Sequence, residues 1–206
     1  MRKTGNWISV LAEPDLQFWM YKVVINLIGI FTILLPLVLI YLGIDQQENH
    51  YYGLYPKRFD FSPYFWMLAL MLPLMVSASF FPSFLNQYPM YKISNAHLVL
   101  DVPEWLTVLI YEFAYGFDFI TVEFLFRGFM VIGMTHILGR NAVLAMVVTY
   151  CFLHTGKPLG EAISSVFGGY LLGVIAYETK SIWGGVIVHV GIAWMMEVIG
   201  FSQKYF

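Results

Sequence analysis

The chain has 206 residues, of which 59% are apolar and 12% are charged, and its mean hydropathy is +0.70. Soluble domains carry roughly 25% charged residues, so we expect a lipid bilayer rather than water to be the main solvent. The net charge of -2 comes without any basic tract, which excludes the electrostatic footprint of a nucleic-acid-binding protein. The single cysteine, Cys151, excludes a disulfide framework.

The first part of the chain contains two plain apolar runs. Residues 23–43 and 61–85 carry no charged side chain, and each is long enough to cross a hydrocarbon core that needs about 20 residues. Pro73 predicts a kink in the second run. Between the runs, Tyr51 and Tyr55 are aromatics of the kind that lie in the headgroup layer.

The longest polar stretch, residues 86–104, separates these two runs from a half whose apolar segments contain ionisable residues. We therefore predict two regions. Residues 1–104 form N-terminal anchor helices and loops, and residues 105–206 form a core that carries the chemistry.

The core begins with one helical run that is too long for a membrane and one that is too short. Residues 105–138 would make a helix of roughly 50 Å, whereas the hydrocarbon core is about 30 Å thick, so this helix must tilt or break near Gly116. Residues 141–154 are too few to cross, and Gly156 and Pro158 follow them. We predict a backbone break at 156–158, which requires an interior cavity to satisfy its polar groups.

Two further apolar runs, residues 162–177 and 181–200, complete the set. Gly169 and Gly173 predict a face of small residues on which a neighbouring helix packs closely. The expected fold is an all-α membrane protein, a bundle of about six transmembrane helices at the length that a span needs.

An ion pair is predicted within the first core helix. Glu123 precedes Arg127 by four residues, which is the spacing and order of an intrahelical pair. A charge near the bilayer centre costs at least about 2.5 kcal/mol, so the side of the helix that carries Glu123 and Arg127 must contact protein or water. The alternative to a functional role is a structural pair that ties helices together.

Two histidines lie in the later apolar segments. His154 ends the short run and His189 lies in the last one, so with Glu123 they place ionisable groups on three different segments, the pattern of a site inside a bundle. A carboxylate and an imidazole can activate a water while a second imidazole stabilises the oxyanion. Alternatively, His154, His189 and Glu123 could bind zinc with one open position. The sequence HExxH is absent, so no cofactor is expected, and zinc is kept as an alternative.

Glu161 follows the predicted break. It either reaches the same cavity as His154 or offsets the positive end of the helix that begins there.

Three short motifs resemble those of the CAAX-protease and bacteriocin-processing (CPBP) membrane proteins. That family's pattern is two adjacent Glu, three residues and Arg; an aromatic residue, three residues and His; and a final His with Asn or Asp four residues later. Here Glu123 and Arg127 fit the first motif, Tyr150 and His154 the second, and His189 the third.

The resemblance covers about residues 105–200 and departs from the pattern at two positions. Val122 stands where the first Glu belongs, the one usually assigned to water activation, and Ala193 stands where the final Asn belongs. Glu123 or Glu161 would therefore have to act as the base.

The resemblance implies a glutamic-type intramembrane endopeptidase that cuts prenylated C-termini, leader peptides or other membrane substrates. In this hypothesis Glu123 and His154 activate water, His189 stabilises the oxyanion and Arg127 orients Glu123. The expected partners are a peptide or lipidated protein and the bilayer. The expected location is a bacterial inner membrane, crossed several times. The sequence indicates no oligomeric state.

Two other functions remain open. A catalytically inactive relative would use the same cavity as a scaffold for a partner's transmembrane or lipidated segment, and the missing Glu favours it. A small transporter subunit would use the polar side chains as a pathway, but the sequence has no inverted repeats of the kind that many transporters have.

Overall fold

The computed structural model describes residues 10–45, 51–55 and 60–205, and in this part of the chain all regular structure is helical. Most segments are α-helices, η1, η2 and η4 are π-helical, and η3 is a short 3-10 turn. In chain order the elements are α2 (Pro14–Leu27), η1 (Ile30–Leu34), α3 (Leu35–Ile40), η2 (Tyr41–Asp45), η3 (Tyr51–Gly53), α4 (Ser62–Ala78), α5 (Pro82–Gln87), α6 (Ala96–Leu100), α7 (Glu104–Glu123), η4 (Phe124–Gly133), α8 (Thr135–Leu138), α9 (Asn141–Phe152), α10 (Leu159–Thr179) and α11 (Trp183–Tyr205).

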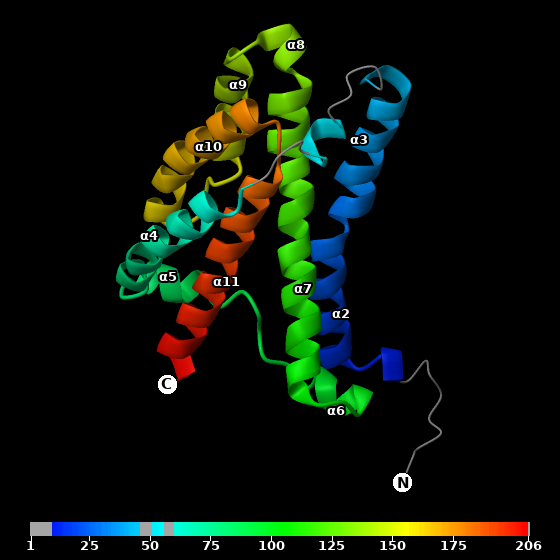
Figure 1. Cartoon of the computed structure of the whole chain (residues 1–206). Helices are drawn as coiled ribbons and strands as arrows, with labels where there is room; N and C mark the ends of the chain where they lie inside the picture. The colour runs from blue at the N-terminus through cyan, green and yellow to red at the C-terminus, as the bar shows by residue number, and fades with distance from the viewer. Residues whose placement is uncertain (1–9, 46–50, 56–59, 206) are drawn as a thin grey trace.

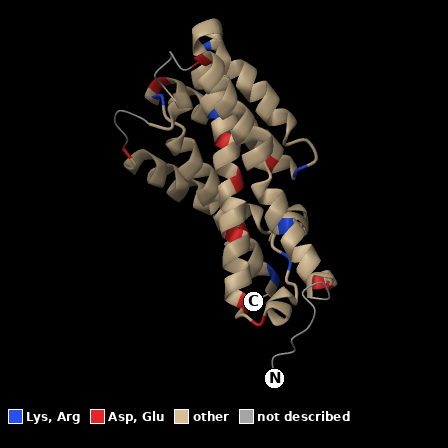
Figure 2. Cartoon of the chain, turned by 90° about the vertical axis from the view of Figure 1, so that its right-hand side faces the viewer, with Lys and Arg blue, Asp and Glu red and all other residues tan. Residues whose placement is uncertain are grey.

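Several helices are suited to a bilayer. The stretches long and apolar enough to cross it are Pro14–Asp45, Leu159–Thr179 and Trp183–Tyr205. Shorter apolar helices are Ser62–Ala78 and Asn141–Phe152. Large apolar side chains stay exposed on the helices, Trp66 at 75% and Phe152 at 79%, and charged residues are sparse along most helices (Figure 2). The chain is an all-α membrane protein, as predicted, and the count of about six crossings stays a prediction.

The long helix formed by α7 and η4 runs through the middle of the molecule (Figure 1). It contacts α2 on one side and α11 on the other, and α11 also packs on α4. Helices α9 and α10 pair with each other and both contact η4. The residues that resemble the CPBP motifs therefore come from helices that meet around η4.

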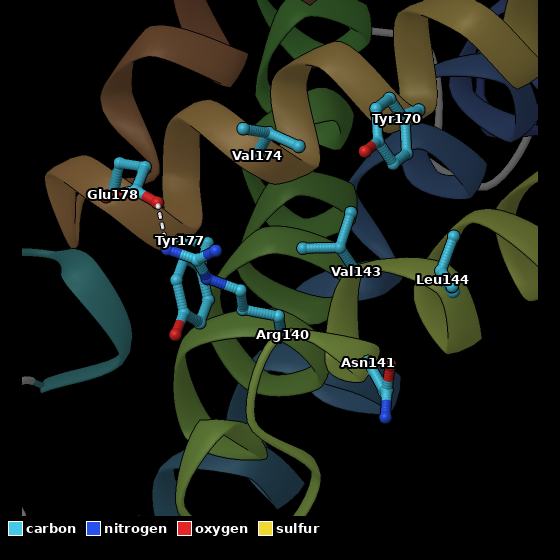
Figure 3. Close-up of a pocket in the computed structure, with 8 residues that line it drawn as sticks. All are labelled: Arg140, Asn141, Val143, Leu144, Tyr170, Val174, Tyr177 and Glu178. Carbon is cyan, nitrogen blue, oxygen red and sulfur yellow. Dashed lines mark ion pairs between the residues drawn. The ribbon is translucent and has the colours of Figure 1, made fainter.

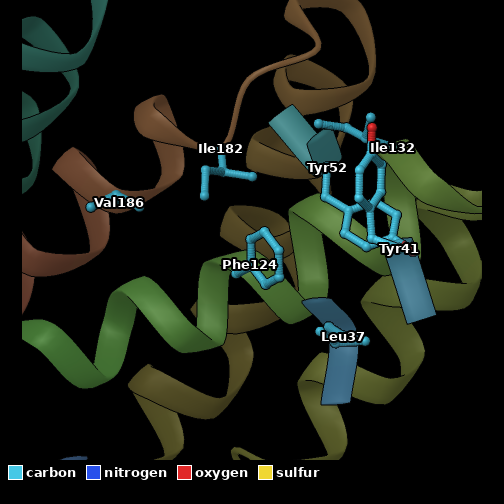
Figure 4. Packing of buried hydrophobic residues seen from close by; sticks show 7 residues of the cluster. All are labelled: Leu37, Tyr41, Tyr52, Phe124, Ile132, Ile182 and Val186. Atoms are coloured by element: carbon cyan, nitrogen blue, oxygen red, sulfur yellow. The ribbon is translucent and has the colours of Figure 1, made fainter. Parts of the chain in front are cut away.

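A cluster of buried side chains fixes one end of this arrangement. Tyr52 is fully buried against η4, and its hydroxyl donates a 2.6 Å hydrogen bond to Asp45. Burial and the Asp45 carboxylate raise the pKa of Tyr52, so the phenol stays protonated and able to donate. A Cβ at Gly128 would lie 2.8 Å from the Tyr52 carbonyl oxygen, so only glycine allows this approach. Figure 4 shows the cluster: Leu37, Tyr41, Tyr52, Phe124, Ile132, Ile182 and Val186.

The predicted backbone break is confirmed. Helix α9 ends at Phe152, Gly156 has φ of +91°, and α10 begins at Leu159 directly after Pro158. The positive φ of Gly156 ends the chain's helical path, and Pro158 caps α10 with a non-helical backbone directly before its first turn.

The predicted contact face of small residues is also confirmed. A Cβ at Gly173 would lie 2.6 Å from Met146, and one at Gly169 would lie 3.0 Å from the Tyr150 ring. Both glycines therefore let α9 approach α10 closely.

One detail of the predicted helices is wrong, and one of two alternatives is ruled out. The second apolar run does not continue as one helix to residue 85, because α4 ends at Ala78 and Pro82 begins α5. For the long core helix, which was expected to tilt or to break near Gly116, the break is ruled out, because Gly116 lies inside α7. A Cβ at Gly116 would lie 3.0 Å from the Trp194 ring, so this glycine serves close packing on α11, and the irregularity begins at Phe124, where the π-helix starts.

Candidate active site

A buried ion pair lies where α7 becomes π-helical. Glu123 is the last residue of α7, and Arg127 lies in the first turn of η4. Arg127 Nη1 donates to Glu123 Oε1 at 2.8 Å, and both side chains are 0% exposed. π-Helical turns are often found at functional sites. The predicted i,i+4 pair is therefore confirmed, but as a fully enclosed pair rather than one that faces a wet cavity.

His189 joins this pair from α11. Its Nδ1 lies 2.9 Å from Glu123 Oε1, so the carboxylate accepts a hydrogen bond from the imidazole as well as from Arg127. The His189 side chain is 17% exposed, whereas that of Glu123 has no exposure. A carboxylate on Nδ1 fixes the tautomer and leaves Nε2 as the available nitrogen.

Tyr150 connects the remaining groups. Its hydroxyl lies 3.3 Å from His189 Nε2, and the Arg127 guanidinium lies over its ring, 4.6 Å from the centroid. The His154 ring lies 4.6 Å from the Tyr150 ring, and His154 Nδ1 is 3.1 Å from the Tyr150 carbonyl oxygen. Sequence reasoning treated Tyr150 only as the aromatic residue of a motif, and its place four residues before His154 was the signal of a larger role.

The free oxygen of Glu123 faces α11. Among the described residues Glu123 Oε2 is buried without a hydrogen-bond partner, and a Cβ at Gly185 would overlap with it. Gly185, which sequence reasoning did not single out, therefore makes the room in which the carboxylate lies. Its position four residues before His189, on the same helix face, was the only signal in the sequence.

Glu161 lies in a different set of contacts. It accepts a 3.0 Å hydrogen bond from the Tyr88 hydroxyl and lies 3.3 Å from Lys157 Nζ. These contacts tie the start of α10 to the loop that follows α5. The structure thus brings Glu123, Arg127 and His189 into direct contact, links His154 to them through Tyr150, and gives Glu161 other partners.

The two departures from the motif pattern have clear places. Val122 is half-buried and packs against the cluster that contains Phe126 and Tyr150. Ala193 is 1% exposed and packs with Tyr91, Tyr111 and Tyr115. At both positions an apolar side chain stands where the family pattern has a polar one, and it packs against other apolar groups.

The three residues that were considered as alternative zinc ligands, His154, His189 and Glu123, do not all lie together. Glu123 and His189 are hydrogen-bonded, whereas His154 reaches them through Tyr150. Within residues 10–45, 51–55 and 60–205, no three His, Cys, Asp or Glu side chains lie close enough together to hold a metal ion.

A comparison with protein families gives a match to the second half of the chain. Residues 102–195 match the family described as type II CAAX prenyl endopeptidase Rce1-like, and this segment contains Glu123, Arg127, Tyr150, His154 and His189. No match was found among curated proteins or among solved structures. Residues 102–195 are therefore similar to the Rce1-like family of type II CAAX prenyl endopeptidases, in agreement with the resemblance of the motifs.

Proposed function

We propose that the chain is an intramembrane endopeptidase in which His189 is the base that activates water. The observation that carries this proposal is the 2.9 Å contact between His189 Nδ1 and Glu123 Oε1. A carboxylate on one ring nitrogen holds the imidazole in place and stabilises the imidazolium that forms when the other nitrogen takes a proton, as in other His-carboxylate pairs. His189, unlike Glu123, is partly exposed.

Each remaining group has a role in this proposal. Water gives its proton to His189 Nε2, and the resulting hydroxide attacks the substrate carbonyl carbon. The Tyr150 hydroxyl, next to Nε2, and the His154 ring stabilise the oxyanion by hydrogen bonding. His189 then returns the proton to the leaving amine, which completes hydrolysis. Arg127 holds the Glu123 carboxylate in position through their 2.8 Å ion pair.

This division of roles differs from the one expected from the sequence, in which Glu123 and His154 act on water directly. The complete burial of Glu123 supports action through His189. The proposal uses no cofactor. Three further points stay predictions from the sequence. The substrate is a peptide or lipidated protein segment in the bilayer, and the location is the bacterial inner membrane. The chain is divided into an N-terminal anchor region, residues 1–104, and a core region, residues 105–206.

The test is cleavage of a fluorescent farnesylated peptide by the full chain reconstituted in vesicles. Replacing His189→Ala should lower the turnover rate by about 100-fold or more, the usual worth of a positioned base, and His154→Ala should lower it less. His136→Ala, at an exposed histidine in α8, is the matched control and should cleave as wild type does. Equal cleavage by wild type and His189→Ala would remove His189 from the mechanism.

A second candidate is a catalytically silent relative that binds a membrane segment. Val122 in place of the first Glu, together with a carboxylate that has no exposure, favours it. In the same vesicles this candidate requires that wild type and His189→Ala bind the farnesylated peptide equally while neither releases product. Product release by wild type alone contradicts it.

A further inference from the structure

A cavity outside the candidate active site lies between the start of α9 and the end of α10. Its volume is about 280 Å³, just below the roughly 300 to 1,000 Å³ of typical small-ligand sites. Figure 3 shows charged side chains at one end of it and apolar side chains beside them. A cavity of this size would take a headgroup and its glycerol rather than a whole lipid molecule.

The polar end carries one charge of each sign. Arg140 Nη2 and Glu178 Oε1 are 4.0 Å apart, at the limit of an ion pair, and their side chains are 84% and 62% exposed. An exposed pair at this distance contributes little to stability, so both charges remain available to a ligand. Lys180 lies close by, with its ammonium 4.3 Å from the centre of the Tyr177 ring that also lines the cavity.

The rest of the lining is apolar or aromatic. Val143, Leu144 and Val174 form the apolar part, and Tyr177 borders it. Leu144 is 55% exposed, so the apolar part opens to the outside of the helix pair, where the acyl chains of a bilayer would lie.

The cavity lies at the level expected for headgroups. Helix α10, a candidate span, ends at Thr179. The Ile182 N–H, just beyond it, donates to the Gly53 carbonyl at 3.2 Å, which holds the loop with the exposed Tyr51 and Tyr55 beside this end of α10. Exposed tyrosines mark the boundary between hydrocarbon and water.

We propose that this cavity binds a zwitterionic phospholipid with an ethanolamine headgroup. The Arg140 guanidinium binds the phosphate through paired N–H donors, as guanidinium groups commonly do, and Lys180 adds a second positive charge. The Glu178 carboxylate accepts hydrogen bonds from the ammonium of the headgroup. The adjacent opposite charges of the protein thus match the adjacent opposite charges of the lipid, and Val143, Leu144 and Val174 contact the first part of an acyl chain.

The test is native mass spectrometry of the full chain in detergent with equal amounts of dioleoyl phosphatidylethanolamine and dioleoyl phosphatidylglycerol. Wild type should retain phosphatidylethanolamine preferentially. Arg140→Gln should weaken retention of both lipids by about tenfold, since it removes a charge-assisted bond. Glu178→Gln should abolish the preference by weakening only phosphatidylethanolamine. The Arg140 and Glu178 side chains are both exposed, so both variants should fold.

Lys204→Gln and Glu13→Gln are the matched controls, because both remove an exposed charge elsewhere, and both should bind as wild type does. Equal retention of the two lipids by wild type, or a preference for phosphatidylglycerol, would overturn the proposal. The proposal is also overturned if Arg140→Gln and Glu178→Gln retain both lipids as the control variants do, because the retained lipid would then be bound elsewhere.

Discussion

Two carboxylates are buried in the central helices, and their surroundings differ. Glu197 on α11 is 5% exposed, and its two oxygens accept hydrogen bonds from the backbone N–H groups of Met90 and Tyr91 at 2.6 and 3.0 Å. Glu123 on α7 is 0% exposed, yet Oε1 accepts both of its hydrogen bonds and Oε2 has no partner among the described residues.

The difference separates a structural carboxylate from one suited to chemistry. Glu197 is satisfied by backbone groups that cannot change protonation state, so it fixes the loop after α5 against α11. Glu123 is bound through Oε1 alone, by Arg127 and His189, and the imidazole of His189 can gain and lose a proton. A buried polar atom without a partner, such as Glu123 Oε2, lowers the stability of the fold. Local destabilisation of this kind is often found at functional sites.

The largest expected effect comes from removing the counter-charge of Glu123. Arg127→Met leaves that carboxylate buried without its cation and should lower the free energy of unfolding by about 3 to 5 kcal/mol. Denaturant titration of the purified chain in detergent measures it. Adding Glu123→Gln to Arg127→Met should restore much of the stability, because the uncompensated charge is then gone.

Lys204→Met, at an exposed cation, is the control for Arg127→Met and should change stability by less than about 0.5 kcal/mol. If Arg127→Met costs no more than this control, the ion pair does not stabilise the fold.

Glu197→Ala should have the next largest effect. It leaves the Met90 and Tyr91 amides without their acceptor, at a cost of about 1.5 to 3 kcal/mol for bonds to a charged group. The fraction that remains folded should cleave the farnesylated peptide at the wild-type rate, since no proposed catalytic group contacts Glu197. The exposed Glu13→Ala should leave both stability and cleavage unchanged. A lower rate per folded molecule in Glu197→Ala would give this carboxylate a part in the chemistry.

The sequence predicted those features of the site that depend on local spacing. Glu123 and Arg127 form their pair within one helix, and Gly156 breaks the backbone where glycine and proline chemistry requires it. The contact of Glu123 with His189 spans 66 residues of sequence. That these two segments meet was suggested by the cost of ionisable groups in apolar segments and by the resemblance to a known family, whereas local spacing gave no sign of it.

The role of Glu197 and the end of α4 were not predicted. Glu197 appeared as one charge in a long apolar run, because its partners are backbone amides of Met90 and Tyr91, which no residue type reveals. The end of α4 at Ala78 lies between Ser77 and Ser79, with no glycine, asparagine or charged residue to mark it before Pro82. Tertiary contacts rather than local preference decide such cases.

Gly185→Ala tests the space around the free oxygen of Glu123. The added Cβ would overlap with Oε2, so α11 or the carboxylate must shift, at a cost of about 1 to 3 kcal/mol. Because the shift moves Glu123 relative to His189, cleavage per folded molecule should also fall.

Gly168→Ala is the matched control for Gly185→Ala, since a Cβ at Gly168 would meet no atom within 4 Å. It should leave stability equal or slightly higher, by up to about 1 kcal/mol for alanine over glycine in a helix, and should not change cleavage. If Gly185→Ala and Gly168→Ala have the same stability and the same cleavage rate, the Glu123 carboxylate does not need the space at Gly185.

The smallest expected effect on stability comes from Tyr150→Phe, which removes one hydroxyl 3.3 Å from His189 Nε2. The long contact contributes about 0.5 to 1.5 kcal/mol at most, and the ring stays in place beneath the Arg127 guanidinium. If Tyr150 helps to stabilise the oxyanion, the turnover rate should nonetheless fall by roughly 10- to 1,000-fold with little change in KM. Tyr170→Phe, at an exposed tyrosine of α10, is the control and should leave the rate unchanged. A Tyr150→Phe rate equal to wild type would limit the hydroxyl to packing and leave His154 to stabilise the oxyanion.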